Sequence, residues 1–477
     1  MKRGGVVVVI VLVGIVLALG YRSLRSESPS EPESRPPARK VILIVLDTVR
    51  ADRLGCYGNA LGLTPNIDEF ARGAVRFEQA FAHAPWTLPS IASLLTSQHP
   101  RQHGAGGQLP QFQMLPPEAV TLGEVFQRAG VATHAIVNVL FLTERLGMTQ
   151  GFDTVDADAP ATNVKVRRAE PTTDAALAWL EQHGDGPFLL MVHYFDAHLV
   201  YDPPAVFRER FADERDRDST GYLFGTIREM NALRAGRLRL DRGRVERLKK
   251  LYNGEVAYVD AEVGRLLEGI SQQGLDDETV VVITADHGEE FFEHGGFEHG
   301  HTHFDELLHV PLLMRAPNVK TRATVSTTVR QIDVAPTLCE LTGVEADPDF
   351  VGQSLMPLMQ GREEDDRPVL SEGNFWGWRR EAWREGGMKL IRSFAPAEVQ
   401  LFDVRNDPGE LIDLAERAPE QRDRMVEEVK LVIRAMATEA VTSKSPVLTQ
   451  EEIEHLASLG YLQLPEEEDD AEQPSEE

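Results

Sequence analysis

The feature that most constrains this chain is a pair of short, mostly apolar segments, each followed by an acidic residue. Val41–Leu46 reads VILIVL and precedes Asp47. Val280–Ala285 reads VVVITA and precedes Asp286 and His287. Apolar runs bounded by polar residues are typical of strands buried on both faces of a parallel sheet, and ligands of such sheets bind at the carboxyl ends of the strands. The pair therefore predicts an α/β fold with a ligand site at two strand ends.

The residue types at these strand ends suit a metal ion. Two carboxylates and one imidazole, from Asp47, Asp286 and His287, can together hold a divalent cation. The alternative interpretation is that both aspartates only cap the turns that follow the strands. Two strands far apart in the sequence that end in the same kind of side chain favour the metal site.

A third segment, Trp86–Ser97, adds a hydroxyl group. Thr87 lies two residues before Pro89, and the apolar spacing that follows predicts a helix that begins here. The N-terminus of a helix is the positive end of its dipole, where anions bind. A neighbouring metal ion would lower the pKa of the hydroxyl and make it a nucleophile. In the alternative interpretation, Thr87 is only a helix cap.

These three segments, in this order and spacing, resemble the sulfatase family of the alkaline phosphatase superfamily. The resemblance extends from about Lys40 to Tyr461, because further segments match the family in the same order: Thr64–Ser97, His193–His198, Tyr252–Leu267, His309–Pro317, Gln331–Gly343 and Leu401–Ala415. It implies an α/β alkaline-phosphatase-like fold, with a large mixed sheet flanked by helices and a small C-terminal antiparallel sheet.

The resemblance also implies a role for each matching residue. Asp47, Asp286 and His287 match metal ligands. Thr87 matches the nucleophile, which in the family also contacts the metal. His198 matches a histidine on the substrate side, and His299 matches the general acid that serves the leaving group. His301 is close enough to His299 in sequence to be a second candidate for substrate binding.

The chain also departs from the family pattern. Sulfatases that use formylglycine carry Cys or Ser where this chain has Thr87, and Arg where it has Ile91. The second Asp of the first strand is replaced by Thr48, and a family Lys aligns with Gly300. The segment that matches a substrate-binding Lys-Trp-His motif offers only Asn138 as a substrate contact. The chain thus resembles the branch with an unmodified Thr nucleophile, which includes phosphoethanolamine and phosphoglycerol transferases.

Three functions remain open at this point. The first is a metal-dependent hydrolase of sulfate or phosphate esters outside the cytoplasm, the second is a transferase to a lipid or glycan, and the third is an inactive binding protein. One divalent cation is expected. The mixed carboxylate and imidazole ligands, and the replacement of an Asp by Thr48, favour Zn²⁺ or Mn²⁺ and leave Ca²⁺ and Mg²⁺ open.

The N-terminus predicts the compartment. Lys2 and Arg3 precede the uncharged, apolar run Gly4–Gly20, which suits a membrane anchor or a cleaved signal and places the catalytic part outside the cytoplasm. The formal net charge of −27 argues against a nucleic-acid partner. We predict an anchor or signal at 1–21, a linker at 22–39, a catalytic domain at 40–360, a C-terminal subdomain at 361–462 and an acidic disordered tail at 463–477.

Overall fold

The computed structural model describes residues 39–108, 111–157, 166–211, 232–234, 237–317, 324–436, 443–458 and 461. The chain divides into two compact units, Met1–Pro37 and Ala38–Glu477. The predicted anchor, nearly all of the predicted linker and the acidic tail lie outside the described residues. Within the described ranges, no helix combines the length and the apolar character needed to cross a membrane.

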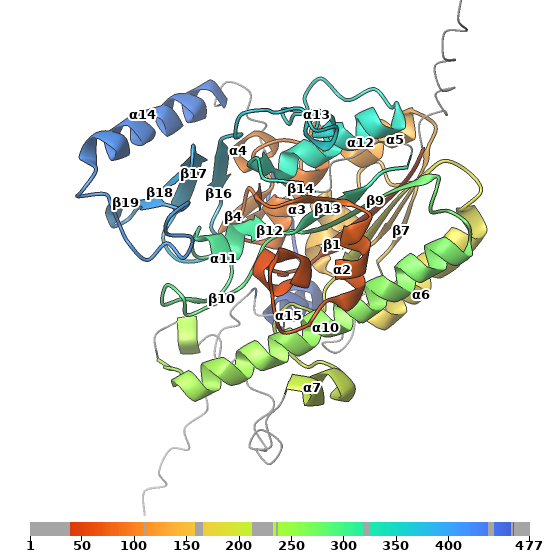
Figure 1. Cartoon of the computed structure of the whole chain (residues 1–477), viewed down its shortest axis with the longest axis horizontal. Helices are drawn as coiled ribbons and strands as arrows, with labels where there is room; N and C mark the ends of the chain where they lie inside the picture. Colours follow the sequence, from red (N-terminus) through yellow and green to blue (C-terminus); the bar gives the residue numbers. More distant parts are fainter. Residues whose placement is uncertain are drawn as a thin grey trace, which may run out of the picture. The chain divides into compact units, whose positions relative to one another are not determined.

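A mixed sheet of eight strands forms the centre of the second unit (Figure 1). In spatial order its strands are β14 (Thr324–Val325), β2 (Val75–Phe77), β13 (Leu312–Arg315), β9 (Thr279–Ala285), β1 (Lys40–Leu46), β8 (Phe188–Tyr194), β6 (Ala132–Ile136) and β7 (Thr154–Asp156). The five strands from β9 to β7 are parallel, whereas β13 runs antiparallel to β9. This arrangement confirms the predicted fold class.

Strand β1 lies between β8 and β9 and pairs with both over its whole length. Leu46 is level with Tyr194 of β8 and with Ala285 of β9. Val41–Leu46 are almost completely buried because the strand has neighbours on both sides and helices above and below. The register brings the ends of β1 and β9 together, so Asp47 and Asp286 emerge side by side.

Helices cover both faces of this sheet. In Figure 1, α6 and α10 run along one side, and α5 and α12 lie along the other. The α-helices that lie wholly within the described residues are α2 (Pro65–Arg72), α3 (Thr87–Thr96), α4 (Pro100–His103), α5 (Leu122–Arg128), α6 (Ala169–His183), α7 (Ala205–Phe211), α10 (Arg242–Gln272), α11 (Asp305–Leu308), α12 (Val334–Thr342), α13 (Met356–Met359), α14 (Pro419–Met436) and α15 (Gln450–Ser458).

Short strands support the loops around the main sheet, and a separate sheet follows near the C-terminus. The short strands are β3 (Ala80–Phe81), β4 (Gly106–Gln108), β5 (Gln111–Gln113), β10 (Glu290–Phe291), β11 (Phe297–Glu298), β12 (His309–Val310) and β15 (Val329–Arg330). The C-terminal sheet is antiparallel and consists of β16 (Val369–Glu372), β17 (Arg380–Glu385), β18 (Met388–Phe394) and β19 (Ala397–Asp403).

The C-terminal sheet has an apolar core of its own, which α14 covers (Figure 1). Met425 and Val429 of α14 pack against Leu390 and Leu401 of this sheet. The segment after α14 behaves differently, because Leu456, Ala457 and Tyr461 belong to the core of the main sheet. The predicted subdomain at 361–462 therefore contains a final segment that packs on the catalytic part of the chain.

A buried ion cluster ties the C-terminal sheet to the main part. The Lys389 ammonium of β18 is 1% exposed and lies 2.6 Å from Asp305 Oδ1 of α11 and 2.8 Å from Glu410 Oε1. Burial raises the pKa of Glu410 to about 7, although Lys389 opposes this shift. Arg384 also pairs with Asp305, so Glu410 is the carboxylate of this cluster that depends on the Lys389 ammonium for its compensation.

We predict that Lys389→Met destabilises the protein by about 3–5 kcal/mol, because it leaves the buried Glu410 without its cation and Asp305 with Arg384 as its remaining ion pair. The matched control is Lys430→Met, which removes the exposed ion pair with Glu427 and should cost less than about 1 kcal/mol. Urea unfolding of both variants measures the difference. Equal losses would show that the Lys389 cluster contributes no more than a surface pair.

Candidate active site

Three polar side chains at the ends of β1 and β9 form a compact, fully buried group. Asp47, Asp286 and His287 each offer a ligand atom, and these atoms lie within 4.8 Å of one another. All three residues have no exposed surface. The parallel pairing of β1 with β9 brings these side chains together. The sequence predicted this proximity, because the three residues follow the ends of two buried strands.

Three of the four carboxylate oxygens of this group have no hydrogen-bond donor among the described residues. Neither oxygen of Asp47, nor Oδ2 of Asp286, has a hydrogen-bond partner among the described residues. His193 Nε2 lies 3.2 Å from Asp47 Oδ2, but burial lowers the pKa of His193 to about 3 and keeps the ring neutral. Burial and the neighbouring Asp286 raise the pKa of Asp47 well above its usual value. Asp286 Oδ1 accepts from the amides of Thr48 and His287, and the remaining free carboxylate oxygens are an environment that a divalent cation fits.

His287 presents its Nε2 atom to this group. Its Nδ1–H donates to the carbonyl of Gly288 at 2.9 Å, so the lone pair is on Nε2. Nε2 lies 3.2 Å from Asp286 Oδ2 and 3.3 Å from Thr87 Oγ1. A metal ligand whose other ring nitrogen is fixed by a backbone carbonyl is a common arrangement for histidine. The three ligand atoms and the hydroxyl of Thr87 therefore face one small volume.

Thr87 is the first residue of α3, which is wholly buried. Trp86 precedes it with extended backbone, so the first amide groups of the helix point toward the site. Ser90, one turn later, donates to the carbonyl of Asp286 at 2.5 Å and ties the helix start to the end of β9. The helix therefore places a hydroxyl, with the positive end of a dipole, beside the carboxylate group.

Two further histidines lie next to this group. His198 and His299 have ring centroids 4.9 Å apart, and His299 lies 4.5 Å from the ring of His287. His299 Nδ1 is 3.0 Å from Glu289 Oε1, and Tyr201 donates to the other oxygen of Glu289 at 2.8 Å. Burial lowers the pKa values of His198 and His299 well below the usual histidine value. Both rings are thus neutral donors and acceptors in the metal-free protein.

Several residues at this site were not predicted from the sequence. Tyr461, from the segment after α15, is fully buried beside His198, and its phenol oxygen lies 2.6 Å from His198 Nε2. His193 and Glu289 were also missed as site residues. His193 could have been predicted as a site residue, because it lies near the end of the buried strand β8. The position of Glu289 two residues after His287 is a weaker indication that it belongs to the site. Nothing in the local sequence indicates that Tyr461 does.

Most of the predicted catalytic domain matches a known protein family. The family described as "Sulfatase" matches residues 39–344, which is more than half of the chain. The chain belongs to the sulfatase family. It is therefore a sulfuric ester hydrolase of the alkaline phosphatase superfamily, as the order of its motifs predicted. A second family, "N-sulphoglucosamine sulphohydrolase, C-terminal", matches residues 292–438.

Individual sulfatases are similar along most of their length. The chain is 24% identical to N-acetylglucosamine-6-O-sulfatase of Bacteroides thetaiotaomicron, with 86% of this chain and 89% of that protein covered. It is 24% identical to arylsulfatase K of Homo sapiens, with 86% of this chain and 84% of that protein covered.

Solved structures share the fold. A protein in complex with its substrate D-glucosamine-2-N,6-O-disulfate matches with a TM-score of 0.70 and 21% identity, over 85% of this chain and 99% of that chain. Phosphonate monoester hydrolase of Agrobacterium radiobacter matches with a TM-score of 0.67 and 21% identity, over 84% of this chain and 96% of that chain. The sulfatase fold therefore accounts for both the main sheet and the C-terminal sheet.

The positions where this sulfatase departs from the family pattern have clear structural settings. Thr48 has a positive φ of 58°, its hydroxyl donates to the carbonyl of Asp47, and its amide donates to Asp286 Oδ1 at 3.1 Å. Ile91 is completely buried in the apolar core. Gly300 has a φ of +80°, and a Cβ there would lie 2.7 Å from Phe375 Cβ. A longer side chain at position 300 would require its neighbours to move.

Asn138 and His301, the two weaker candidates for substrate binding, lie in different surroundings, and Asn138 lies among neighbouring elements of the fold. Asn138 donates to Thr172 Oγ1 at 3.0 Å and to the carbonyl of His193, and it accepts from Arg167 Nε at 2.7 Å. These three contacts hold the ends of neighbouring elements together, so the structure gives Asn138 a supporting position. None of them reaches Asp47, Asp286 or His287.

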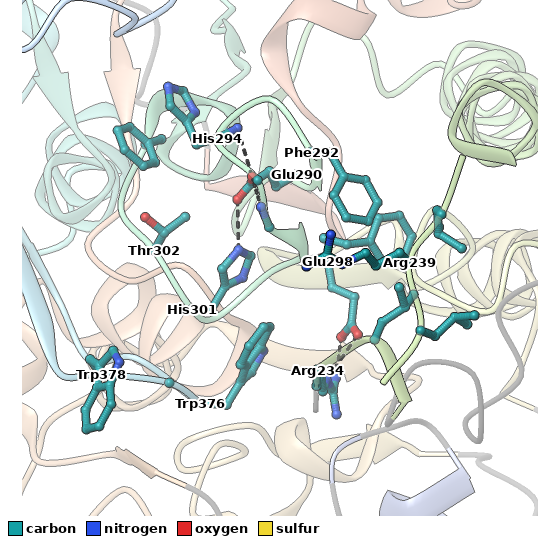
Figure 2. A pocket seen from close by; sticks show the side chains of 18 of the residues that line it. Arg234, Arg239, Glu290, Phe292, His294, Glu298, His301, Thr302, Trp376 and Trp378 are labelled. Atoms are coloured by element: carbon teal, nitrogen blue, oxygen red, sulfur yellow. Dashed lines mark hydrogen bonds and ion pairs between the residues drawn. The ribbon is translucent and has the colours of Figure 1, made fainter. Parts of the chain in front are cut away.

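His301 lines a cavity of about 1000 Å³ next to the site. Figure 2 shows its ring facing Glu290, with Nε2 2.8 Å from Glu290 Oε2, while Trp376 stacks on it at a centroid distance of 4.5 Å. The residues that line this cavity include Trp378 and Arg380 but none of the three metal-ligand candidates. Contact with His301 would therefore involve a part of the substrate remote from the ester.

We predict that Asp47→Asn removes the bound cation, because it deletes one of two anionic ligands without breaking a protein hydrogen bond. Elemental analysis of purified wild-type and variant protein measures the loss. Without metal, the variant should unfold at a higher temperature than the wild type, because the repulsion between buried carboxylates is gone.

With metal at 100 times its dissociation constant, the wild type alone should gain about 2.7 kcal/mol. Asp174→Asn, at an exposed residue paired with Arg265, is the control and should keep both the cation and the gain. Unchanged metal content in Asp47→Asn would place the cation elsewhere.

Proposed function

We propose that this sulfatase-family chain hydrolyses sulfate or phosphate esters with unmodified Thr87 as the nucleophile and one divalent cation. The observation that carries the proposal is the position of Thr87 Oγ1, 3.3 Å from His287 Nε2 at the N-terminus of α3. A hydroxyl that only capped the helix would not require two buried carboxylates beside it. When bound, the cation would lower the pKa of the hydroxyl and polarise an oxygen of the ester.

The first chemical step is an in-line displacement. Thr87 first loses its hydroxyl proton to solvent, and the resulting alkoxide Oγ1 forms a bond to sulfur or phosphorus while the bond to the leaving oxygen breaks and the charge spreads over the equatorial oxygens. The amide groups at the start of α3 and the cation site lie where they stabilise this charge. Sulfate and phosphate esters share this geometry, so the same residues serve either chemistry.

His299 is placed to protonate the leaving oxygen. Its Nδ1 is engaged by Glu289 Oε1, so the proton for the leaving oxygen is carried on Nε2, and the acid form of the ring during the reaction is the imidazolium. Tyr201 holds the other oxygen of Glu289 and so fixes the carboxyl group. Glu289 is therefore a positioning residue, and His299 acts as the general acid.

The second step separates this mechanism from that of a formylglycine enzyme. An aldehyde hydrate releases its group by collapsing, whereas the Thr87 ester must be cleaved by water or by an acceptor alcohol. Cleavage by water gives a hydrolase, and cleavage by an alcohol of a lipid or glycan gives the transferase alternative. The buried set of Asp47, Thr87, Asp286 and His287 argues against an inactive binding protein, which has no need of a nucleophile.

The relatives suggest the substrate class. One is an N-acetylglucosamine-6-O-sulfatase, and a structure with the same fold holds a disulfated glucosamine. We propose a sulfate ester on a sugar as the first substrate to test, with phosphate monoesters, phosphodiesters and phosphonates as the second class. The aromatic side chains of Trp376 and Trp378 in the neighbouring cavity are compatible with a large substrate.

The ligand types suggest the cation. Two carboxylates, an imidazole and a hydroxyl favour Zn²⁺ or Mn²⁺ over the all-oxygen environments of Ca²⁺ and Mg²⁺. Thr48 supports this preference, since its hydroxyl bonds to its own backbone neighbourhood and adds no charge. Separate loading with Zn²⁺, Mn²⁺, Ca²⁺ and Mg²⁺ before each assay tests it.

We predict that Thr87→Val, which keeps the side-chain shape and removes the hydroxyl, lowers kcat about a thousandfold or more. Thr87→Ser is the matched control and should retain measurable turnover. The assay uses aryl sulfate, N-acetylglucosamine 6-sulfate, phosphate monoester, phosphodiester and phosphonate. Mass spectrometry of the wild-type peptide should find unmodified Thr87 and, after an acid quench during turnover, a sulfated or phosphorylated Thr87.

Two results would contradict the nucleophile assignment. Near-full turnover by Thr87→Val would show that Thr87 only caps the helix and is not the nucleophile. An aldehyde at position 87 in the wild-type peptide would replace the alkoxide mechanism. The mass of the trapped ester also decides between sulfuryl and phosphoryl transfer, because the two groups are distinguished by accurate mass.

We further propose that the N-terminal run Gly4–Gly20 directs the catalytic part out of the cytoplasm, either as a membrane anchor or as a cleaved signal. Its apolar composition after two basic residues supports this. We predict that protease added to spheroplasts of cells that express the full chain digests the catalytic part. Deletion of residues 4–20 should protect it. Protection of the full-length protein would contradict the proposal.

A further inference from the structure

The cavity beside His301 has a charge balance unlike that of the whole chain. Its volume of about 1000 Å³ lies at the upper end of the range for small-molecule sites. Among the described residues, its lining carries three arginines and two glutamates: Arg234, Arg239, Arg380, Glu290 and Glu298. The chain as a whole has a formal net charge of −27. A cavity with excess positive charge in such a chain favours an anionic ligand.

Both glutamates of the lining are already bound by groups of the protein. Glu298 forms an ion pair with Arg234, whose Nε atom lies 3.0 Å from Glu298 Oε1. Glu290 Oε2 lies 2.8 Å from His301 Nε2, and Glu290 Oε1 accepts from two backbone amides at 2.7 and 3.0 Å. Neither carboxylate therefore depends on the other two arginines of the cavity.

Those two arginines, Arg239 and Arg380, have no ion pair within the part of the chain that the structure describes. Arg380 Nη1 donates to the carbonyl of His301 at 2.5 Å, which fixes the side chain at the cavity wall. Burial lowers the pKa of Arg380, and the charges of Glu398 and Glu290 oppose this shift only in part. Arg239 is exposed and also lines the cavity. Guanidinium groups without a carboxylate are suited to the acidic group of a ligand.

The two tryptophans of the cavity differ in how much of the ring is available. His301 stacks on Trp376 at a centroid distance of 4.5 Å, and the Arg234 guanidinium lies 5.6 Å from the same ring. Trp378 is 57% exposed and has no ring partner among the described residues. In Figure 2, Trp378 lies to the left of His301 and Arg239 to its right. The exposed indole therefore offers an apolar surface in the same cavity as the arginines.

One short segment joins this cavity to the ester site. The ring of His299 lies 4.5 Å from the ring of His287, and the carbonyl of His299 accepts from Trp376 Nε1 at 2.9 Å. His301 of the cavity follows two residues after His299, and two residues of chain span at most about 7 Å. The two sites are therefore close enough to hold neighbouring parts of one ligand.

We propose that the cavity binds acidic groups on the sugar units next to the ester, so that the substrate is an oligosaccharide with several sulfate or carboxylate groups. This inference rests on the proposed function, which supplies the ester site. Arg239 and Arg380 bind the additional acidic groups through charged hydrogen bonds, and Trp378 packs on a sugar ring. The cavity thereby favours acidic oligosaccharides over single sugars and small aryl esters.

The test measures binding in the absence of turnover. Full-length Thr87→Val protein is titrated by calorimetry with a heparin-derived tetrasaccharide, with the neutral sugar chitotetraose and with polyphosphate. The heparin tetrasaccharide should bind more tightly than the other two. In the same background, Arg239→Gln and Trp378→Ala should each weaken its binding about tenfold, the effect of one lost charged or aromatic contact.

Arg379→Gln is the matched control for charge. Arg379 is the exposed neighbour of Arg380, but its guanidinium lies 4.9 Å from the ring centroid of Phe394, and Arg379 does not line the cavity. The variant removes the same charge as Arg239→Gln and should keep the affinity for the heparin tetrasaccharide. Thermal unfolding of each variant checks that the fold is retained.

A second measurement tests whether the cavity and the ester site hold one ligand. In protein with Thr87 intact, the heparin tetrasaccharide should inhibit turnover of p-nitrophenyl sulfate competitively, because a single ligand occupies both sites. Arg239→Gln should raise the inhibition constant about tenfold. Arg380→Lys should raise it as well, since an ammonium cannot make the planar, paired contacts of a guanidinium.

Four results would overturn the proposal. Equal affinity for chitotetraose would show that acidic groups are not recognised, and equal affinity for polyphosphate would show that the sugar is not. An equal loss in Arg379→Gln would show general attraction to a charged surface. Noncompetitive inhibition would separate the cavity from the ester site. Turnover that survives Thr87→Val would instead overturn the proposed function and leave the binding results in place, so the two failures are distinguished.

Discussion

The parallel pairing of β1 with β9 forces two carboxylates together in a place where water cannot reach them. Asp47 and Asp286 follow strands in register, and each of them is completely buried. Bringing like charges together in the interior is unfavourable, so the pair remains ionised only with a compensating cation. The other groups of the site surround these two carboxylates. The start of α3 contributes Thr87, and the loop after β9 contributes His287 and Glu289.

Much of this architecture could be predicted from the sequence. The apolar runs of β1 and β9 identified the central strands, and the order of the motifs identified the family and its fold. The metal-ligand candidates lie together because strand ends in a parallel sheet meet at one edge, which is a rule that sequence reasoning can apply. The helix at Thr87 was likewise marked by Pro89 and by its apolar spacing.

Other parts of the site could not be predicted, because they depend on contacts between distant segments. Tyr461 contacts His198 although the two residues are 263 positions apart in the sequence. No periodicity in the sequence indicates such a contact. At Thr48, the replacement of an Asp could be read from the sequence. The positive φ that turns the Thr48 hydroxyl toward the backbone could not be predicted from it. The replacement of a family Lys at Gly300 became understandable only when Phe375 was found against it.

The packing of Leu456, Ala457 and Tyr461 into the main core has a consequence for how the molecule is made. Strand β1 is among the first parts of the catalytic unit to be synthesised, and the segment around Tyr461 follows hundreds of residues later. Contacts between such distant segments form late, since the intervening chain must be ordered first. The active site therefore stays open along one wall until translation has passed residue 461, and an interrupted or shortened polypeptide would retain the ligand cluster while lacking that wall.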